Sequence, residues 1–429
     1  MMTNTKKTND PTITIVFNNA LVCSGFCGFC TVANKVNYHQ GFDKNNIIKS
    51  LIDKDDRLYQ MIETDYDALE KAIVSYPGWR NCKKFGISVW GADPITSFQN
   101  YRELYEFIED LAHRYDKEVS FSGSTNGLAF LRDDVTEWFL EKDNIHMQIS
   151  HDGWGNWMRA LDIDTLTNEN ILKLMRHGTI NWISCVMNFY NASPLQNIAY
   201  FKDVLPEDIY KKIQIRLYTV RDSDYDSNFI NYNGYLGNKV FPELKGRRLG
   251  DLVIHNDQKL ADETGLFQLA HQADTYFSEI EYIYRHIDRE EYDPYRRVLI
   301  QRLAEYNKKM SIEGNPLSYQ RPKCAQYHLG LSEYSNCIDT LGKYTDCHLY
   351  DSNQHVPNPG MIKPKRCEQC KYKNKWECNI CGANELNPNY CQWNYRHNEL
   401  MERLSESKWL MDWVRTYNKD RNIRNKKIH

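Results

Sequence analysis

Short apolar runs alternate with amphipathic stretches over the first half of the chain. The runs are rich in Val, Ile, Phe and Thr and end at polar or turn-forming residues, which is typical of β-strands. They predict six strands, at residues 12–17, 85–90, 118–123, 145–150, 181–188 and 213–220. Between them, stretches such as 101–115 repeat apolar residues every three or four positions, the spacing of one helix face.

This order of strands and helices predicts an α/β fold with βα units around a parallel sheet. Six units in about 210 residues favour a partial (β/α)6 barrel over the closed eight-fold barrel. In such sheets the reactive groups collect at the carboxyl ends of the strands.

The pattern changes after the sixth strand. Residues 221–320 start as a polar, loop-rich stretch and continue as helical stretches rich in Tyr, Glu and Arg, so we expect a connector with one or two long helices. From Cys324 to Cys391 the periodicity fades, which is typical of a small domain in which metal replaces a hydrophobic core. The predicted divisions are a flexible N-terminus (1–12), the partial barrel (13–222), a helical connector (223–320), a cysteine-rich domain (321–395) and a C-terminal helix with a basic tail (396–429).

Composition narrows the function classes. The 429 residues are 41% hydrophobic and 26% charged, with a net charge of −3. This balance offers no basic face for nucleic acid, and the chain has no apolar run of about 18 residues that would span a membrane. The first residues lack the apolar core of a secretory signal peptide, so we expect a cytoplasmic protein.

The 13 cysteines are informative chiefly through their placement. Three lie between residues 23 and 30, eight lie between 324 and 391, and only Cys82 and Cys185 stand alone. A disulfide framework is one explanation, but thiols stay reduced in the cytoplasm. Clustered cysteines in a reducing compartment favour metal ligands.

The first cluster, CSGFCGFC, places Cys23, Cys27 and Cys30 just after the first strand, with the spacing C-x3-C-x2-C. Short polar segments also follow the next three strands: WGADPITS, GSTNGL and SHDGWGNWMR. Each of these alone is ordinary turn chemistry, but their common position at strand ends indicates one site. A zinc site completed by His39 or Cys82 is the alternative for the three cysteines.

With the aromatic Phe29 before Cys30, the cluster matches C-x3-C-x-Φ-C, and residues 13–220 resemble the radical S-adenosylmethionine (radical SAM) superfamily. The resemblance implies that the three thiolates hold three irons of a [4Fe–4S] cluster and that the fourth iron binds SAM. Reduction of that cluster then cleaves SAM to methionine and a 5′-deoxyadenosyl radical, which abstracts a substrate hydrogen.

The same resemblance implies SAM contacts in the later segments. GADP stands where the superfamily has Gly-Gly-Glu-Pro, so Gly91, Ala92 and Asp93 are expected at the SAM ammonium group, with Ala92 replacing the second Gly and Asp93 replacing Glu. The other expected contacts are Ser150 and Arg159 at the SAM carboxylate, Asn188 at the ribose or carboxylate, and Leu217 beside Arg216 at the adenine.

The C-terminal cysteines resemble the SPASM domain, the auxiliary-cluster extension of peptide-modifying radical SAM enzymes. GKYTDC gives Gly-x4-Cys, and CEQCKYKNKWECNIC gives C-x2-C-x7-C-x2-C, in which the spacings are shifted from the usual pattern. Structural zinc sites are the alternative, because C-x2-C pairs suit zinc equally well. The resemblance implies two auxiliary [4Fe–4S] clusters, one held by Cys324, Cys337, Cys347 and Cys381 and the other by Cys367, Cys370, Cys378 and Cys391.

Together the resemblances predict a radical SAM oxidoreductase that matures a ribosomally made peptide by a thioether, C–C or C–O crosslink or by side-chain oxidation. Sulfatase maturases carry an Asp base directly after the Gly-x4-Cys cysteine; His348 stands there and disfavours formylglycine formation. The catalytic base is not identified, and His151 and His348 are the candidates. The same machinery acting on a small molecule, and a non-enzymatic metal-binding module, are the alternatives.

The expected partners are a precursor peptide and a reductant such as flavodoxin or ferredoxin. The first strand begins near residue 12, which leaves no room before it for a leader-binding domain. Leader recognition then falls to the barrel, to the helical connector or to a separate leader-binding protein.

Overall fold

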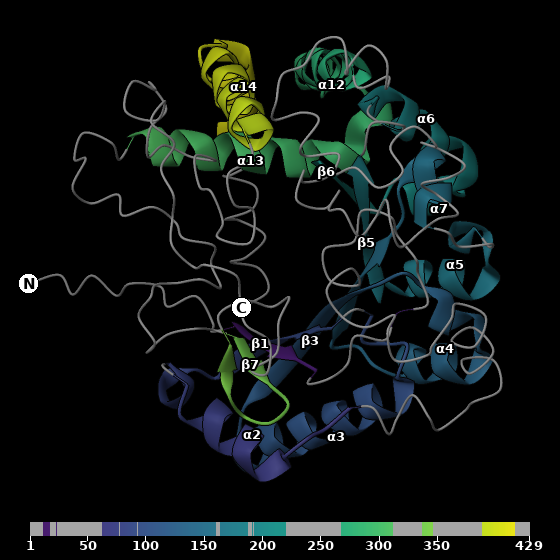
Figure 1. The fold of residues 1–429 in the computed structure, drawn as a ribbon, viewed down its shortest axis with the longest axis vertical. Coiled ribbons are helices and arrows are strands. Elements are labelled where there is room, and N and C mark those ends of the chain that lie inside the picture. Colours follow the sequence, from purple (N-terminus) through teal and green to yellow (C-terminus); the bar gives the residue numbers. More distant parts are fainter. Residues whose placement is uncertain are drawn as a thin grey trace, which may run out of the picture.

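Eight strands form one sheet in the computed structural model, in the order β6-β5-β4-β3-β2-β1-β7-β8 (Figure 1). The structure describes residues 12–17, 23, 62–76, 78–91, 93–159, 164–187, 191, 193–219, 267–311, 337–345 and 388–416. The first six strands run parallel and match the six predicted segments closely, which confirms the partial barrel. They are β1 (Thr12–Val16), β2 (Lys84–Trp90), β3 (Glu118–Thr125), β4 (Ile145–Ser150), β5 (Ile180–Met187) and β6 (Gln214–Thr219).

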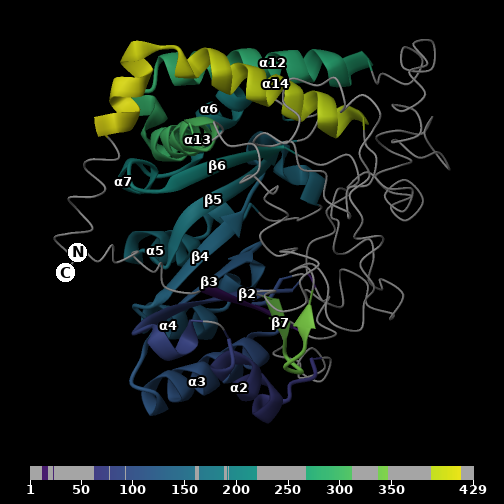
Figure 2. The ribbon, with the colours of Figure 1, turned by 90° about the vertical axis from the view of Figure 1, so that its left-hand side faces the viewer.

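Helices cover the outer face of this sheet (Figure 2). Side-chain oxygens of Asp65, Asn168 and Ser193 cap α2, α5 and α6 by accepting backbone N–H groups of the first turn. The helices are α2 (Tyr66–Val74), α3 (Phe98–Arg114), α4 (Asp133–Leu140), α5 (Glu169–His177), α6 (Pro194–Val204) and α7 (Glu207–Tyr210), with the 3-10 turns η3 (Trp79–Asn81), η4 (Leu128–Leu131), η5 (Gly153–Arg159) and η6 (Thr165–Thr167).

The two faces of the sheet differ in chemistry because side chains alternate along each strand. Positions facing the helices are apolar and buried, among them Phe85, Ile87, Phe121, Met147, Ile149, Ile183, Cys185, Ile215 and Leu217. The opposite face, called the inner face below, carries Ser88, Ser122, Ser124, Gln148, Ser150, Trp182, Ser184, Arg216 and Tyr218. A polar inner face is suited to a ligand rather than to a hydrophobic core.

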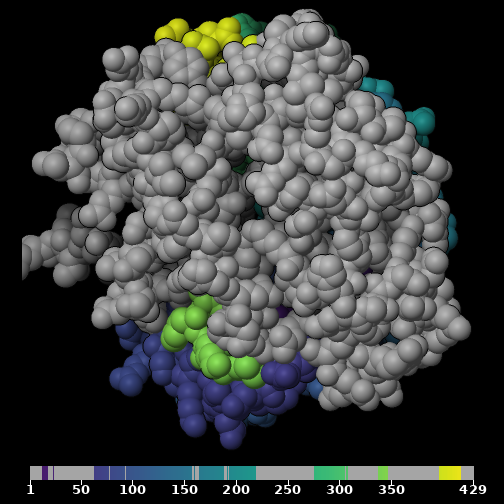
Figure 3. Space-filling view, in the orientation of Figure 1, coloured from purple at the N-terminus to yellow at the C-terminus, as the bar shows by residue number. Residues whose placement is uncertain are grey.

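A short hairpin extends the barrel sheet beyond β1. β7 (Cys337–Asp339) pairs parallel with β1, and β8 (Tyr344–Thr345) pairs antiparallel with β7. Its turn rests on α2, and the hairpin lies beside the N-terminal helices in the space-filling view (Figure 3). Gly342 has φ 73° and approaches so closely that a Cβ would stand 2.5 Å from the Ala68 backbone, so only glycine fits.

The hairpin joins part of the predicted cysteine-rich region to the barrel sheet. The sequence places residues 337–345 in the cysteine-rich domain (321–395), whereas in the structure they belong to the barrel sheet. The added strand covers the edge of β1, whose backbone groups would otherwise be unpaired on that side.

Two long helices occupy the connector, as the sequence predicts: α12 (Phe267–Arg285) and α13 (Asp293–Ser311), with η9 (Glu290–Tyr292) between them. Together with α14 (Pro388–Ser405) they form a helical cap that packs beside β6 and α6 (Figures 1 and 2). α14 begins before the predicted boundary at 396, so Cys391 lies on this helix. Among the described residues, no helix combines the length and apolar character that crossing a membrane requires.

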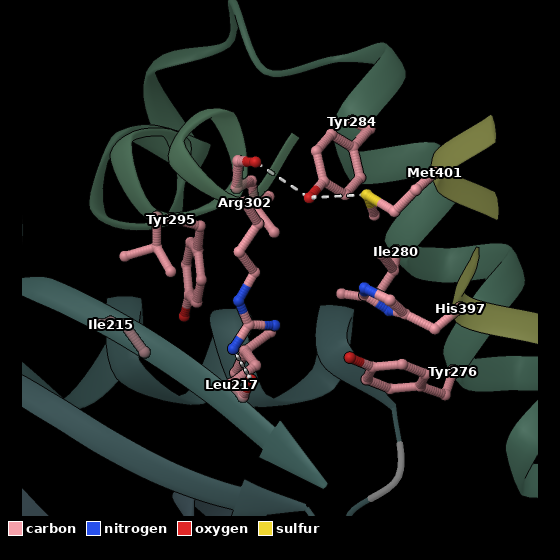
Figure 4. Close-up of a pocket in the computed structure, with 11 residues that line it drawn as sticks. Ile215, Leu217, Tyr276, Ile280, Tyr284, Tyr295, Arg302, His397 and Met401 are labelled. Carbon is pink, nitrogen blue, oxygen red and sulfur yellow. Dashed lines mark hydrogen bonds between the residues drawn. The ribbon is translucent and has the colours of Figure 1, made fainter. Parts of the chain in front are cut away.

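A small cavity lies between the helical cap and β6 (Figure 4). Arg302 of α13 spans it and donates from Nη2 to the Leu217 carbonyl oxygen at 3.3 Å. Tyr284 of α12 donates its hydroxyl to the Leu299 carbonyl oxygen at 3.0 Å. Buried His397 of α14 completes the lining, so three cap helices and the sheet meet at one point.

His397 should make the stability of the cap depend on pH. Burial, together with the nearby Arg302 cation, lowers the pKa of His397 to about 3. The folded protein keeps this imidazole neutral, whereas the unfolded chain protonates it below about pH 6.5. Its contribution to stability is therefore complete above about pH 6.5 and falls by up to about 1.4 kcal/mol per unit as the pH drops toward 3.

When the pH falls from about 7 to about 5, the His397→Phe variant should lose less stability than the wild type does. Thermal unfolding of both proteins at several pH values measures this. His113→Gln, at an exposed position of α3, is the matched control and should keep the wild-type slope. Equal slopes for His397→Phe and the wild type would contradict this assignment.

Candidate functional site

Cys23 and the turn after β3 meet at the carboxyl edge of the sheet. Cys23, the first cysteine of the C-x3-C-x2-C motif, is a partly exposed thiol outside any disulfide. Asn126, directly after β3, donates from Nδ2 to the Cys23 Sγ at 3.6 Å. The predicted cluster ligand therefore contacts the TNG turn that follows β3.

Asp93 joins the loops after β2 and β3. Its Oδ2 accepts the Asn126 backbone N–H at 2.8 Å and the Thr125 hydroxyl at 3.1 Å, and its Oδ1 accepts the Ile95 N–H at 3.2 Å. Burial raises the pKa of this carboxyl, and these donors act in the opposite direction. Asp93, expected at the SAM ammonium group, thus also holds the Asn126 loop beside Cys23, while Gly91 directly follows β2.

The turn after β3 fixes how the Asn126 side chain is oriented. Asn126 Oδ1 accepts the Leu128 N–H at 2.9 Å, and the Gly127 N–H donates to the Thr125 hydroxyl oxygen at 3.1 Å. Gly127 has φ 87°, and a Cβ there would lie 2.8 Å from Ile149 Cδ1. The turn therefore requires glycine at this position.

Three neighbouring strands place polar side chains in one row on the inner face. Ser150 of β4 pairs in register with Ser184 of β5, which pairs with Arg216 of β6. The Ser150 hydroxyl lies 3.1 Å from that of Ser124, and the Arg216 guanidinium stacks 3.4 Å above the Trp182 ring. This row offers hydroxyl groups and a cation to a polar ligand.

Arg159 forms a buried ion pair within the segment after β4. Its Nη2 lies 2.7 Å from the Asp152 Oδ1, which also accepts the Val186 N–H at 2.8 Å. The Asp152 side chain is fully buried and that of Arg159 is 8% exposed. Arg159, expected at the SAM carboxylate, is therefore engaged in holding this loop against β5.

His151 lies in the interior, away from solvent. Its Nδ1 accepts the Gly153 N–H at 3.2 Å, so its proton is on Nε2, 3.0 Å from the Asp164 Oδ1. Asp164 also accepts the Tyr200 hydroxyl, whose ring stacks on the imidazole. Both ring nitrogens therefore have hydrogen-bonding partners and the side chain is fully buried, which is the environment of a structural histidine.

Asp164 should contribute stability that disappears in acid. Burial alone would raise the pKa of Asp164, but the hydrogen bonds from His151 and Tyr200 outweigh it and lower the pKa to about 2. A lowered folded-state pKa means that the contribution is complete above about pH 4 and is lost as the pH falls toward 2.

The variant Asp164→Asn should therefore lose about 1 kcal/mol near neutral pH, after allowing for solvent screening of this half-buried group. Below about pH 4 the difference in stability between Asp164→Asn and the wild type, measured by thermal unfolding, should become smaller. Asp208→Asn, which breaks an exposed pair with Arg176, is the control and should change stability little. A deficit that stays constant down to about pH 3 would contradict this interpretation.

The structure separates Leu217 from the other expected SAM contacts. Leu217 is on the outer face of β6 and lines the cavity under the helical cap, whereas Ser150 and Arg216 are on the inner face. Several other predicted site residues lie outside the described part of the chain, and their roles stay predictions: Cys27, Phe29, Cys30, Ala92, Asn188, Cys324, His348, Cys347, Cys367, Cys370, Cys378 and Cys381.

The auxiliary cysteines are described only at two positions. Cys337 is fully buried in β7, as a small apolar side chain would be. The backbone of Cys391 is in α14, and its side chain lies outside the described residues. Within the described residues no group of three or more possible metal ligands occurs, so the proposed ligand sets rest on the sequence motifs.

The Cys23 environment fits an iron–sulfur cluster. Its thiol is partly exposed and outside any disulfide, at the carboxyl edge of a parallel sheet, and receives an N–H donor of the kind that stabilises a thiolate. With Cys27 and Cys30 in the same motif, the donor set consists of three soft thiolates, which suits iron–sulfur chemistry.

Sequence reasoning missed three residues of this region. Asn126 belongs to a TNG segment with the composition of an ordinary turn. Only its position directly after β3, at the carboxyl edge of the sheet, could have indicated a contact with the cysteine motif. Asp164 and Tyr200 hold His151 from other elements, and no motif in the sequence marks that contact.

The fold is shared with solved structures of one radical SAM/SPASM enzyme, the anaerobic sulfatase-maturating enzyme anSMEcpe. Native anSMEcpe with bound AdoMet and Cp18Cys peptide matches with a TM-score of 0.54 and 13% identity, covering 95% of this chain and 99% of that chain. Hexahistidine-tagged anSMEcpe with bound AdoMet matches with a TM-score of 0.54 and 14% identity, over 95% and 96% of the two chains. The radical SAM resemblance is thereby confirmed at the level of the fold.

No protein-family model matches the sequence, and no curated protein matches it.

Proposed function

We propose that this chain is a radical SAM enzyme with SPASM-type auxiliary clusters that oxidatively modifies a peptide. The observation that carries the proposal is the position of Cys23, the first cysteine of C-x3-C-x2-C, at the carboxyl edge of a radical SAM barrel. Cys23, Cys27 and Cys30 would hold the SAM-binding [4Fe–4S] cluster. When bound and reduced, that cluster supplies the electron that cleaves SAM to a 5′-deoxyadenosyl radical.

The described residues would position the cluster and the substrate. Asp93 holds the Asn126 turn against Cys23, and the Asp152–Arg159 pair holds the loop after β4. The row of Ser150, Ser184 and Arg216 would present polar contacts on the inner face. Rigid anchoring of this kind supports hydrogen abstraction, because the radical must be held close to one particular C–H bond of the substrate.

A peptide is the substrate class we propose. The matched anSMEcpe structure contains a peptide together with AdoMet, and both coverage values, 95% and 99%, show that the likeness extends over nearly the whole of both chains. We propose two auxiliary [4Fe–4S] clusters in the C-terminal cysteine region and a flavodoxin or ferredoxin as electron donor. His348, after the Gly-x4-Cys element, favours a crosslink or another oxidation over formylglycine formation.

Mass spectrometry of a peptide encoded beside the gene tests this proposal. The peptide co-expressed with the wild-type chain should lose the mass of hydrogen atoms. Tandem mass spectra should locate this loss at one residue or at a crosslink between two residues. Co-expression with Cys23→Ala should leave the peptide mass unchanged. If iron-loaded wild type leaves the peptide unmodified but dehydrogenates a sugar alcohol, the substrate is a small molecule and the peptide proposal is wrong.

A further inference from the structure

We infer that Asn126 is a positioning residue that raises the reduction potential of the cluster held by Cys23. The inference rests on the proposed function, because it takes Cys23 as a cluster ligand. The contact that carries it is the N–H···S hydrogen bond from Asn126 Nδ2 to Cys23 Sγ, 3.6 Å long.

The direction of this hydrogen bond is set by the turn around it. An Asn side chain presents either its oxygen or its nitrogen to a neighbour, and the surrounding donors decide which. The Leu128 N–H donates to the Asn126 Oδ1 at 2.9 Å. The amide nitrogen must therefore be the atom that faces Cys23.

The donor is also held in place. The Asn126 backbone N–H donates to buried Asp93 at 2.8 Å, and the residue as a whole is only 6% exposed. The next residue, Gly127, adopts a left-handed conformation that keeps the turn tight. Asn126 therefore needs no reorganisation to donate to the sulfur, and little water competes for the contact.

Hydrogen bonds to cluster sulfurs tune the reduction potential of iron–sulfur clusters. Reduction adds one electron, taken from dithionite or a protein reductant, and makes the thiolates more negative without breaking or forming a bond. An N–H donor stabilises the reduced cluster more than the oxidised one, because the interaction grows with the negative charge on sulfur. Asn126 thus makes reduction easier, the step on which SAM cleavage depends.

The test is an anaerobic redox titration of the reconstituted full chain followed by electron paramagnetic resonance (EPR). The signal of the Cys23 cluster is the one that a Cys23→Ala variant lacks. Asn126→Ser keeps an oxygen for the Leu128 N–H but is too short to reach Cys23. It should lower the equilibrium constant for reduction about threefold to tenfold, roughly 28–59 mV for one electron.

Two comparisons separate this role from a structural one. Asn170→Ser makes the same change on α5, where the lost amide donates to the Asp133 Oδ1 at 2.9 Å, and should keep the wild-type potential. Asn126→Leu, which removes both the turn acceptor and the donor, should shift the potential in the same direction as Asn126→Ser. Unchanged potentials in both Asn126 variants would overturn the inference.

A measurement on the wild type covers the case in which the variants fail to assemble the cluster. With ¹⁵N-labelled asparagine, pulsed EPR should detect a nitrogen coupling on the reduced Cys23 cluster, and absence of that coupling would overturn the inference. If the wild type shows no signal that depends on Cys23, the proposed function itself fails, which is a different result.

Discussion

Replacing Cys23 with alanine should remove one cluster and leave the other two. We expect the iron content of the anaerobically reconstituted protein to fall from about twelve to about eight atoms per chain, four for each cluster. The physical reason is that two remaining thiolates would not retain the SAM-binding cluster, whereas the proposed auxiliary clusters would keep their own ligands. Iron analysis and EPR of the reduced protein, with and without SAM, measure this.

Cys82→Ala is the matched control for Cys23→Ala. Cys82 is also a partly buried thiol outside any disulfide, and its Sγ donates to the Trp79 carbonyl oxygen at 3.3 Å. It lies outside both cysteine motifs, so the variant should keep the full iron content and the SAM-dependent signal. Loss of iron in Cys82→Ala but not in Cys23→Ala would reverse the ligand assignment.

Arg159→Leu should destabilise the barrel strongly, even without SAM. The change leaves the fully buried Asp152 carboxylate without its cation, and breaking a buried pair in this way costs about 3–5 kcal/mol. Thermal unfolding of the apo protein should shift down by roughly 10 °C. If Arg159 served only to hold the SAM carboxylate, the loss would appear in SAM binding and the apo protein would keep its stability.

A double variant isolates the unpaired charge as the cause. Asp152→Asn combined with Arg159→Leu removes both charges and should recover part of the stability lost by Arg159→Leu alone. Arg176→Leu, which breaks the exposed pair with Asp208, is the control for loss of an arginine and should change unfolding little. A double variant less stable than Arg159→Leu would contradict the explanation.

Much of the fold could be predicted because it depends on local pattern. Strands such as 145–150 combine β-branched residues with buried alternation, and the structure places β4 at the same residues. The β7 strand escaped prediction because three residues, CID, carry no periodicity, and their pairing with β1 depends on contacts far along the chain. The early start of α14 was hidden by Asn, Pro and Cys residues that favour a loop by composition.

The site was predictable in its position but not in its contacts. The cysteine motif and the order of the strands place Cys23 at the carboxyl edge of the sheet. The same sequence does not reveal that the Asp93 carboxylate accepts hydrogen bonds from Asn126, Thr125 and Ile95. Nor does it reveal that Arg159 pairs with Asp152. Hydrogen-bonding partners of this kind are chosen by loop geometry, which a motif does not encode.

Formation of 5′-deoxyadenosine is the most direct test of the central claim. Iron-loaded wild type, incubated anaerobically with SAM and dithionite, should release 5′-deoxyadenosine and methionine, and Cys23→Ala should release neither above background. Wild-type protein with a full iron content that yields no more 5′-deoxyadenosine than Cys23→Ala would contradict radical SAM chemistry in this chain.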